Sequence, residues 1–214
     1  AIAGTTSATA RAVSIGGRCL LQPLDWRVAA GERWCVIGRN AAGKSTLLRA
    51  LAGLSESGIA VSGDVLWQGR SARRWSAADA AAMRAFMPQQ AVDRFPMPVS
   101  RLLELGVVLQ RAEPSQVLRA LDLQALASRS VLALSGGERQ RVALAQCAVQ
   151  GAPLLLLDEP VAFQDPAHQG LVARWLAGIQ ASSALVITAH DVNWIARTAT
   201  HVLALLPDGG SERG

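Results

Sequence analysis

The sequence predicts an α/β fold with a mostly parallel sheet and flanking helices. Short apolar runs of strand length alternate with segments of helical spacing over most of its 214 residues. One such run, residues 154–157, is four consecutive leucines, which is typical of a parallel strand buried on both faces. Half of the residues are hydrophobic, so the chain can bury a sizeable core.

The N-terminal part of the chain predicts antiparallel strands, followed by a strand, a glycine loop and a helix. The first two strands alternate apolar and polar side chains, and residues 30–32 form a turn before the next strand. That third strand leads directly into Gly38. The expected elements are strands over residues 12–21, 24–28 and 33–37, a helix over 44–51, a strand over 61–68 and a helix over 76–84.

The middle of the chain predicts an inserted helical subdomain. Short helical pieces are expected over residues 101–109, 114–121 and 123–127, and a longer helix over 136–150 with Ser135 as its N-cap. Strands over 154–157, 184–188 and 202–206 then alternate with helices over 165–179 and 192–198. We expect one domain over residues 1–214, with a β-rich core formed by 1–90 and 151–214 and a helical subdomain over 91–150.

The glycine loop carries a phosphate-binding pattern. Residues 38–45 read Gly-Arg-Asn-Ala-Ala-Gly-Lys-Ser, which fits the spacing of a P-loop between a strand and a helix. Backbone N–H groups of such a loop wrap phosphates, and the positive end of the following helix points at the same anion. Lys44, the only lysine of the chain, is expected to reach the β and γ phosphates, and the Ser45 hydroxyl to bind Mg²⁺. The expected nucleotide-binding residues are Gly38, Arg39, Asn40, Ala41, Ala42, Gly43, Lys44, Ser45 and Thr46.

Two acidic residues follow the leucine strand. Because Asp158 ends this strand, we expect it to lie beside the phosphate-binding loop, where it can hold Mg²⁺. Glu159 is expected next to the γ phosphate, where a carboxylate can orient and deprotonate an attacking water. The competing interpretation is two solvated acids at a strand end. Together with the loop, the pair predicts a P-loop NTPase core that hydrolyses its nucleotide.

A second glycine-rich helix start predicts a second anion site. Leu134-Ser135-Gly136-Gly137-Glu138 opens the long helix, and one bound nucleotide cannot fill both this site and the P-loop. A head-to-tail pair of identical chains solves this. Ser135, Gly136, Gly137 and Glu138 of one copy would close over the nucleotide held by the other.

These motifs resemble those of the ABC ATPases over essentially the whole chain. Leu-Ser-Gly-Gly-Glu followed by Arg-Gln-Arg is similar to the family's signature motif. The resemblance implies that Gln89 is the Q-loop glutamine, which touches Mg²⁺ and communicates with membrane subunits, and that Asp165 is the D-loop aspartate. It also implies that His190 contacts the γ phosphate, so the expected catalytic residues are Glu159, His190 and Lys44. His168 and His201 have no such context and are expected to be structural.

The resemblance also implies partners and a location. ATP and Mg²⁺ are the expected ligands, and a homodimer would work with separate permease subunits at the cytoplasmic face of the membrane. The apolar runs at 154–157 and 184–188 are too short to span a bilayer, so another chain would do so. The net charge of +5 is spread along the chain and the tryptophans are scattered, so a nucleic-acid partner is not expected. Three separated cysteines without a CxxC pair argue against zinc.

The chain departs from the family pattern at the loop and at the adenine position. Arg39 and Ala41 replace the usual Pro and Gly, and a Cβ at Ala41 is tolerable only where the backbone is not left-handed. The D-loop, residues 162–165, lacks the usual Ser. The aromatic that stacks on adenine should fall near Ile15, so adenine is expected to rest on Ile15 and nearby aliphatic atoms.

Several segments resemble importers of iron chelates, haem or cobalamin, namely residues 84–90, 95–99, 103–106 and 190–193. An importer would also need an external substrate-binding protein. Residues 63–69 instead resemble the haem exporter ATPase of cytochrome c maturation. A soluble ABC ATPase is the third alternative, although the chain has neither a second cassette nor a long coiled coil. A regulatory cassette without activity disagrees with the intact Asp158–Glu159 pair.

Overall fold

The computed structural model describes residues 7–15, 21–54, 61–90, 95–109, 112–179 and 181–214. For residues 7, 11–15 and 61 it describes the backbone alone. None of the described helices has the length and apolarity that crossing a bilayer requires.

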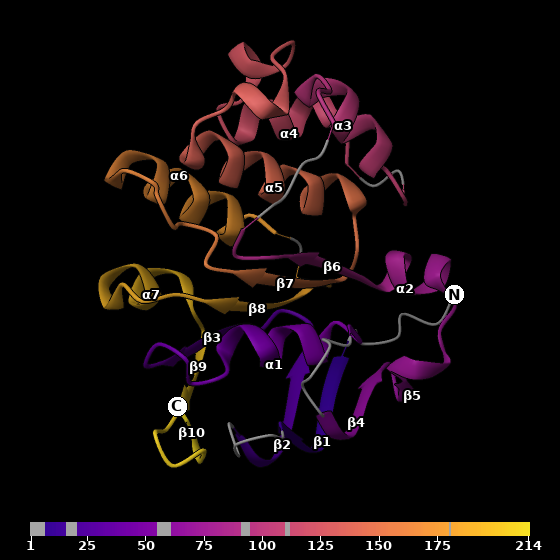
Figure 1. Ribbon diagram of the computed structural model, residues 1–214, viewed down its shortest axis with the longest axis vertical. Helices are drawn as coiled ribbons and strands as arrows, with labels where there is room; N and C mark the ends of the chain where they lie inside the picture. The colour runs from indigo at the N-terminus through magenta and orange to yellow at the C-terminus, as the bar shows by residue number, and fades with distance from the viewer. Residues whose placement is uncertain (1–6, 16–20, 55–60, 91–94, 110–111, 180) are drawn as a thin grey trace.

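A six-stranded sheet forms the centre of the molecule, in the order β10-β9-β3-β8-β7-β6 (Figure 1). Neighbouring strands are parallel except for β10, which is antiparallel to β9. The strands are β3 (Arg33–Gly38), β6 (Arg84–Met87), β7 (Leu154–Asp158), β8 (Ala184–Thr188), β9 (His201–Leu205) and β10 (Ser211–Arg213). The predicted mostly parallel α/β sheet is confirmed.

A four-stranded antiparallel sheet lies beside this centre, in the order β2-β1-β4-β5. Its strands are β1 (Ser7–Ile15), β2 (Leu21–Ala29), β4 (Val61–Trp67) and β5 (Arg70–Ser71). Helix α1 (Lys44–Leu51) lies between the two sheets and contacts strands of both (Figure 1). The helix that follows the glycine loop is therefore fixed on both sides.

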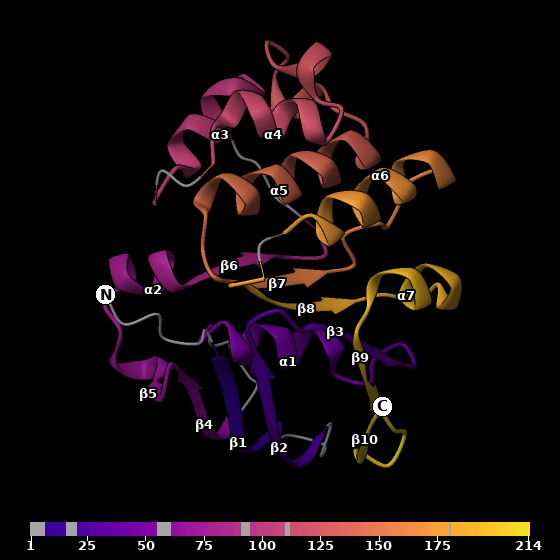
Figure 2. The same ribbon diagram turned by 180° about the vertical axis from the view of Figure 1, so that it is seen from behind.

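Several further helices cover the other face of the central sheet. Helix α5 (Gly136–Gln150) lies between that sheet and the outer pair α3 (Val99–Gly106) and α4 (Pro114–Ala120), with α6 (Pro166–Ala177) beside it, as the opposite view also shows (Figure 2). Helix α2 (Ala77–Met83) precedes β6, and α7 (Val192–Thr198) follows β8. Three short 3₁₀ turns occupy Ala72–Arg74, Gln124–Leu126 and Val131–Ala133.

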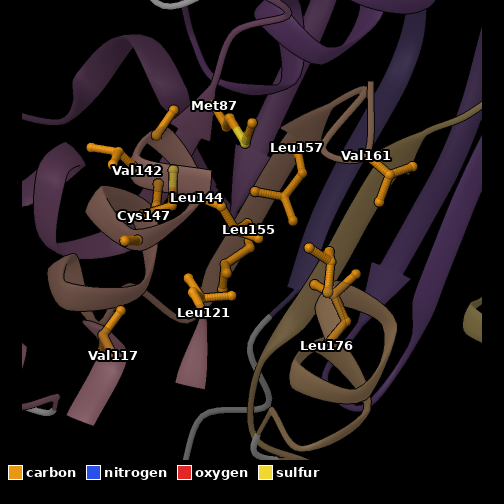
Figure 3. Packing of buried hydrophobic residues seen from close by; sticks show 14 of the residues in the cluster. Met87, Val117, Leu121, Val142, Leu144, Cys147, Leu155, Leu157, Val161 and Leu176 are labelled. Carbon is orange, nitrogen blue, oxygen red and sulfur yellow. The ribbon is translucent and has the colours of Figure 1, made fainter. Parts of the chain in front are cut away.

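Strand β7 connects two hydrophobic cores. Leu155 and Leu157 pack into the core formed with α5 and the outer helices (Figure 3). Leu154 and Leu156 point the other way, into the core around α1 and the antiparallel sheet. Successive side chains of a strand alternate in direction, so a strand between two cores must be apolar at every position. This is the physical reason for the run of four leucines.

Some predicted elements were wrong in extent or kind. The strand expected over 12–21 ends at Ile15, and β2 begins at Leu21 and pairs back onto it in antiparallel fashion with irregular register. Residues 123–127 contain a 3₁₀ turn rather than an α-helix. Strand β6 was missed because its four residues carry little pattern and become a strand by pairing with β7. Strand β10 was missed for the same reason.

Replacing a leucine of β7 should destabilise the whole fold. Leu156 is 0 % exposed, so Leu156→Ala leaves a cavity against α1 and should lower the free energy of unfolding by about 2–5 kcal/mol. Leu132 is 54 % exposed, and Leu132→Ala should change it by less than about 0.5 kcal/mol. Urea titration followed by circular dichroism measures both values, and equal losses in the two variants would contradict the two-core arrangement.

Candidate active site

The phosphate-binding loop connects β3 to α1. Gly38 cannot carry a side chain, because a Cβ there would lie 2.9 Å from the Leu205 carbonyl oxygen of the neighbouring strand. Gly43 is the N-cap of α1 in a left-handed conformation, and no side chain caps this helix end. The first N–H groups of α1 are therefore available to an anion, as the sequence predicts.

Lys44 lies inside the loop that it follows. Its side chain is buried, and Nζ donates to the carbonyl oxygens of Gly38 at 2.9 Å and Arg39 at 3.1 Å. Burial lowers the pKa of the Lys44 ammonium, while the Glu159 and Asp158 carboxylates act in the opposite direction. The Lys44 ammonium is therefore surrounded by the backbone of the phosphate-binding loop, an arrangement suited to binding a polyphosphate.

A cavity of about 440 Å³ opens over this loop. It brings together residues from three distant parts of the chain: the loop itself, Gln89 after β6, and Glu159 after β7. Its lining residues are Asn40, Ala41, Gly43, Lys44, Ser45, Thr46, Gln89 and Glu159. Most of the residues predicted to bind the nucleotide or the metal ion therefore line this one cavity.

Thr188 fixes the two acids at the end of β7. Its hydroxyl donates to Asp158 Oδ1 at 2.6 Å and accepts the backbone N–H of Glu159 at 2.8 Å. Asp158 and Thr188 are both fully buried. No motif in the sequence indicates Thr188, and the signal that identifies it is its register opposite Asp158 on the neighbouring parallel strand.

Glu159 and His190 form a pair at the mouth of the site. Glu159 Oε1 lies 2.7 Å from His190 Nε2. The Glu159 backbone has a left-handed φ of 51°, and its carbonyl oxygen accepts a hydrogen bond from Gln140 Nε2 at 2.9 Å. Both ends of this residue are held, so its carboxylate can point steadily toward the cavity that it lines.

The donor atoms present fit Mg²⁺. Ser45, Gln89 and Asp158 offer hydroxyl, amide and carboxylate oxygens, the hard ligands that Mg²⁺ takes in proteins. In the described part of the chain no three His, Cys, Asp or Glu side chains cluster as a ready-made metal cage.

The signature residues stand apart from this cavity, since none of them lines it within the described chain. Ser135 caps α5: its Oγ accepts Glu138 N–H at 3.3 Å, and Glu138 Oε2 accepts Ser135 N–H at 2.7 Å. The backbone N–H and the hydroxyl of Ser135, with Arg129 nearby, hold the pKa of the Glu138 carboxyl below its usual value.

The structure also bears on four further residues that the sequence analysis names. Asp165 is the N-cap of α6, accepting His168 N–H at 2.9 Å, and its carboxylate lies 2.8 Å from His168 Nδ1. His201 stacks on Trp34 with ring centroids 4.7 Å apart. Both histidines therefore have structural partners, as expected. The Ile15 side chain lies outside the described part of the chain, so its contact with adenine stays a prediction.

Ala41 does not meet the condition set for it in the sequence analysis. Its φ is 62°, in the left-handed region that a Cβ disfavours. The loop must turn there to present successive N–H groups to one point, and the tertiary structure imposes that turn on an alanine. The loop accordingly stores backbone strain at this residue.

Comparison with known proteins agrees with this geometry. A family model described as ABC transporter matches residues 21–162. The hemin import ATP-binding protein HmuV of Streptomyces coelicolor is 41% identical over 207 residues, which cover 92% of this chain and 72% of that protein. The vitamin B12 import ATP-binding protein BtuD of Vibrio vulnificus is 38% identical over 209 residues, covering 90% and 82%.

Solved structures share the fold. A bacterial Atm1-family ABC exporter with ATP bound superposes with a TM-score of 0.84 at 27% identity, covering 98% of this chain and 39% of that chain. An ATP binding subunit of an ABC transporter gives 0.83 at 21% identity, covering 97% and 89%, which supports the fold alone.

Relieving the strain at Ala41 should stabilise the protein. Ala41→Gly removes the Cβ from a left-handed residue and should raise the free energy of unfolding by about 0.5–1 kcal/mol, after the entropy that glycine adds to the unfolded chain. Ala42 does not have a positive φ, so Ala42→Gly should lower that free energy instead. Urea titration of the nucleotide-free variants distinguishes the two, and a loss of stability in both would argue against a strained loop.

Proposed function

The chain belongs to the ABC transporter family and is an ATPase of that family; from this premise we propose that it is the motor subunit of an importer for haem, cobalamin or an iron chelate. The observation that carries the proposal is the single cavity in which the loop, Gln89 and Glu159 meet. The high identity to haem and vitamin B12 import proteins supports the cargo class.

We propose that hydrolysis proceeds by attack of water on the γ phosphorus of ATP. Loop N–H groups and Lys44 hold the phosphates, and Glu159 orients the water and takes its proton. His190, 2.7 Å from Glu159, keeps the carboxylate aimed and contacts the γ phosphate. When bound at Ser45, Asp158 and Gln89, Mg²⁺ supplies charge that offsets the charge of the phosphates. The bond between the γ phosphorus and the β–γ bridging oxygen breaks, the bridging oxygen stays with ADP, and ADP and phosphate leave.

A second copy of the chain completes the site in this proposal. The capped helix start at Ser135 and the loop at Lys44 are two anion sites that one nucleotide cannot fill together. Two large apolar side chains are exposed, one near the signature motif and one near His190: Phe163 at 74 % and Val192 at 75 %. Phe163 lies beside Gly136, and Val192 follows His190 by two residues. Covering these side chains favours closure of two chains around two ATP molecules.

A permease covers a different surface. The helical subdomain exposes Phe95 at 73 %, Leu105 at 60 % and Val108 at 42 %. We propose that the coupling surface runs from Gln89 along residues 94–103, of which Arg94 lies outside the described chain. We assign residues 91–150 as the helical subdomain and residues 1–90 with 151–214 as the core that holds ATP. An external binding protein would deliver the cargo, with this subunit at the cytoplasmic face.

Glu159→Gln should stop turnover without weakening ATP binding. The amide keeps the shape and the contact with His190 but cannot take a proton, so the hydrolysis rate should fall by at least about 100-fold. Phosphate release and fluorescent-nucleotide titration measure the two properties. Glu113→Gln, at an exposed acid before α4, is the matched control and should keep the wild-type rate. A Glu159→Gln variant with nearly full activity would refute the assignment of the base.

Capture from detergent-solubilised membranes tests the transporter role. The tagged chain should recover a many-helix membrane protein in roughly equal amount. Phe95→Ser with Leu105→Ser should lose that partner, since exposed apolar side chains drive docking. Phe163→Ser with Val192→Ser should retain it while losing ATP-dependent dimers. Recovery of ribosomes or soluble assembly factors without a membrane protein would replace the transporter by a soluble ABC ATPase. Recovery of a membrane protein of an exporter would contradict the proposed import and favour export.

A further inference from the structure

Gln164, in the D-loop, is a buried polar residue with partners on a different element. Its Oε1 accepts a hydrogen bond from Arg141 Nη1 at 3.1 Å, and its Nε2 donates to the Gly137 carbonyl oxygen at 2.7 Å. Gln164 is 8 % exposed and Arg141 is 6 % exposed. Both partners belong to α5, so one side chain spans the first turns of the helix that carries the signature motif.

The backbone of this region is packed as tightly as the side chain. A Cβ added at Gly137 would lie 2.8 Å from the Phe163 carbonyl oxygen, so the first turn of α5 touches the D-loop directly. Phe163 itself has a left-handed φ of 61°. A strained turn persists only where its surroundings hold it, and the Gln164 hydrogen bonds lie at the next residue.

Helix α5 also forms a hydrogen bond with the beginning of the segment formed by residues 159–164. Gln140, 4 % exposed, donates to the Glu159 carbonyl oxygen at 2.9 Å. Consecutive residues of α5, Gln140 and Arg141, therefore hold the beginning and the end of residues 159–164. Buried hydrogen bonds of this kind are costly to break, because each leaves an unsatisfied polar group.

We propose that Gln164 is a positioning residue that locks the D-loop to the signature helix, so that Glu159, the D-loop and the start of α5 move as one body. The inference rests on the proposed function. When the signature motif of one chain binds ATP held by a second copy, the start of α5 in the first chain is displaced. Because the D-loop is locked to α5, this displacement also shifts Glu159 of the first chain. Hydrolysis at the two sites is then coupled through α5.

Glutamine is suited to this position because it presents an acceptor and a donor at the same end. Methionine has similar length and offers neither hydrogen bond. Glutamate keeps the acceptor for Arg141 but loses the donor to Gly137. The pair of variants therefore separates the two bonds, and Gln124→Met, at an exposed glutamine, is the matched control.

The experiment measures steady-state ATP hydrolysis and ATP affinity for wild type, Gln164→Met, Gln164→Glu and Gln124→Met. Loss of the lock should lower kcat of Gln164→Met about tenfold and bring its Hill coefficient to about one, with the ATP dissociation constant within about twofold of wild type. Gln164→Glu should fall between Gln164→Met and wild type. Thermal unfolding shows whether Gln164→Met is folded. If it is not, the kcat and Hill coefficient of Gln164→Glu test the proposal.

Hydrogen exchange of the nucleotide-free protein tests the lock independently of activity. Gln164→Met should accelerate amide exchange in residues 160–165 and at the start of α5 together, and Gln124→Met should change neither. A wild type without ATPase activity would refute the proposed function, whereas the exchange result would still judge the lock. Unchanged exchange, kcat and Hill coefficient in folded Gln164→Met would overturn the inference.

Discussion

The site depends on the parallel pairing of β3, β8 and β7. Carboxyl ends of parallel strands meet at one edge of a sheet, and these three strands deliver the phosphate loop, Thr188 and Asp158 there. Strand β8 lies between the other two, so its last residue stands between the loop and the acids. From this position the Thr188 hydroxyl forms hydrogen bonds with both the Asp158 carboxylate and the backbone N–H of Glu159.

That pairing is maintained by burial on both faces of the sheet. Strand β7 sends alternate leucines into two cores, one around α1 and one around α5. Helix α1 thus has its anion-binding end fixed by packing along its length. The strained residues at the site, Ala41 and Glu159, keep their left-handed backbones because this packing leaves them no alternative.

Helix α5 joins the fold to the outer helices. It packs on β6, shares a hydrophobic core with Leu155 and Leu157 of β7, and contacts α3 and α4, and its first turns hold the segment after β7. The element that presents the signature residues is therefore the element that reaches the exposed apolar surface of the helical subdomain.

The fold class could be predicted from the sequence, because the hydrophobic pattern, the P-loop and the apolar strand ending in two acids depend on local spacing. The same spacing indicated Lys44 and Glu159, and the family resemblance implied His190. The catalytic roles of these three residues stay predictions. Tertiary structure decided what depends on pairing and register: strand β6, the bridge made by Thr188, and the grip of Gln140 and Gln164 on residues 159–164. It also decided the left-handed turn at Ala41, which local preference opposes and only the packed loop enforces.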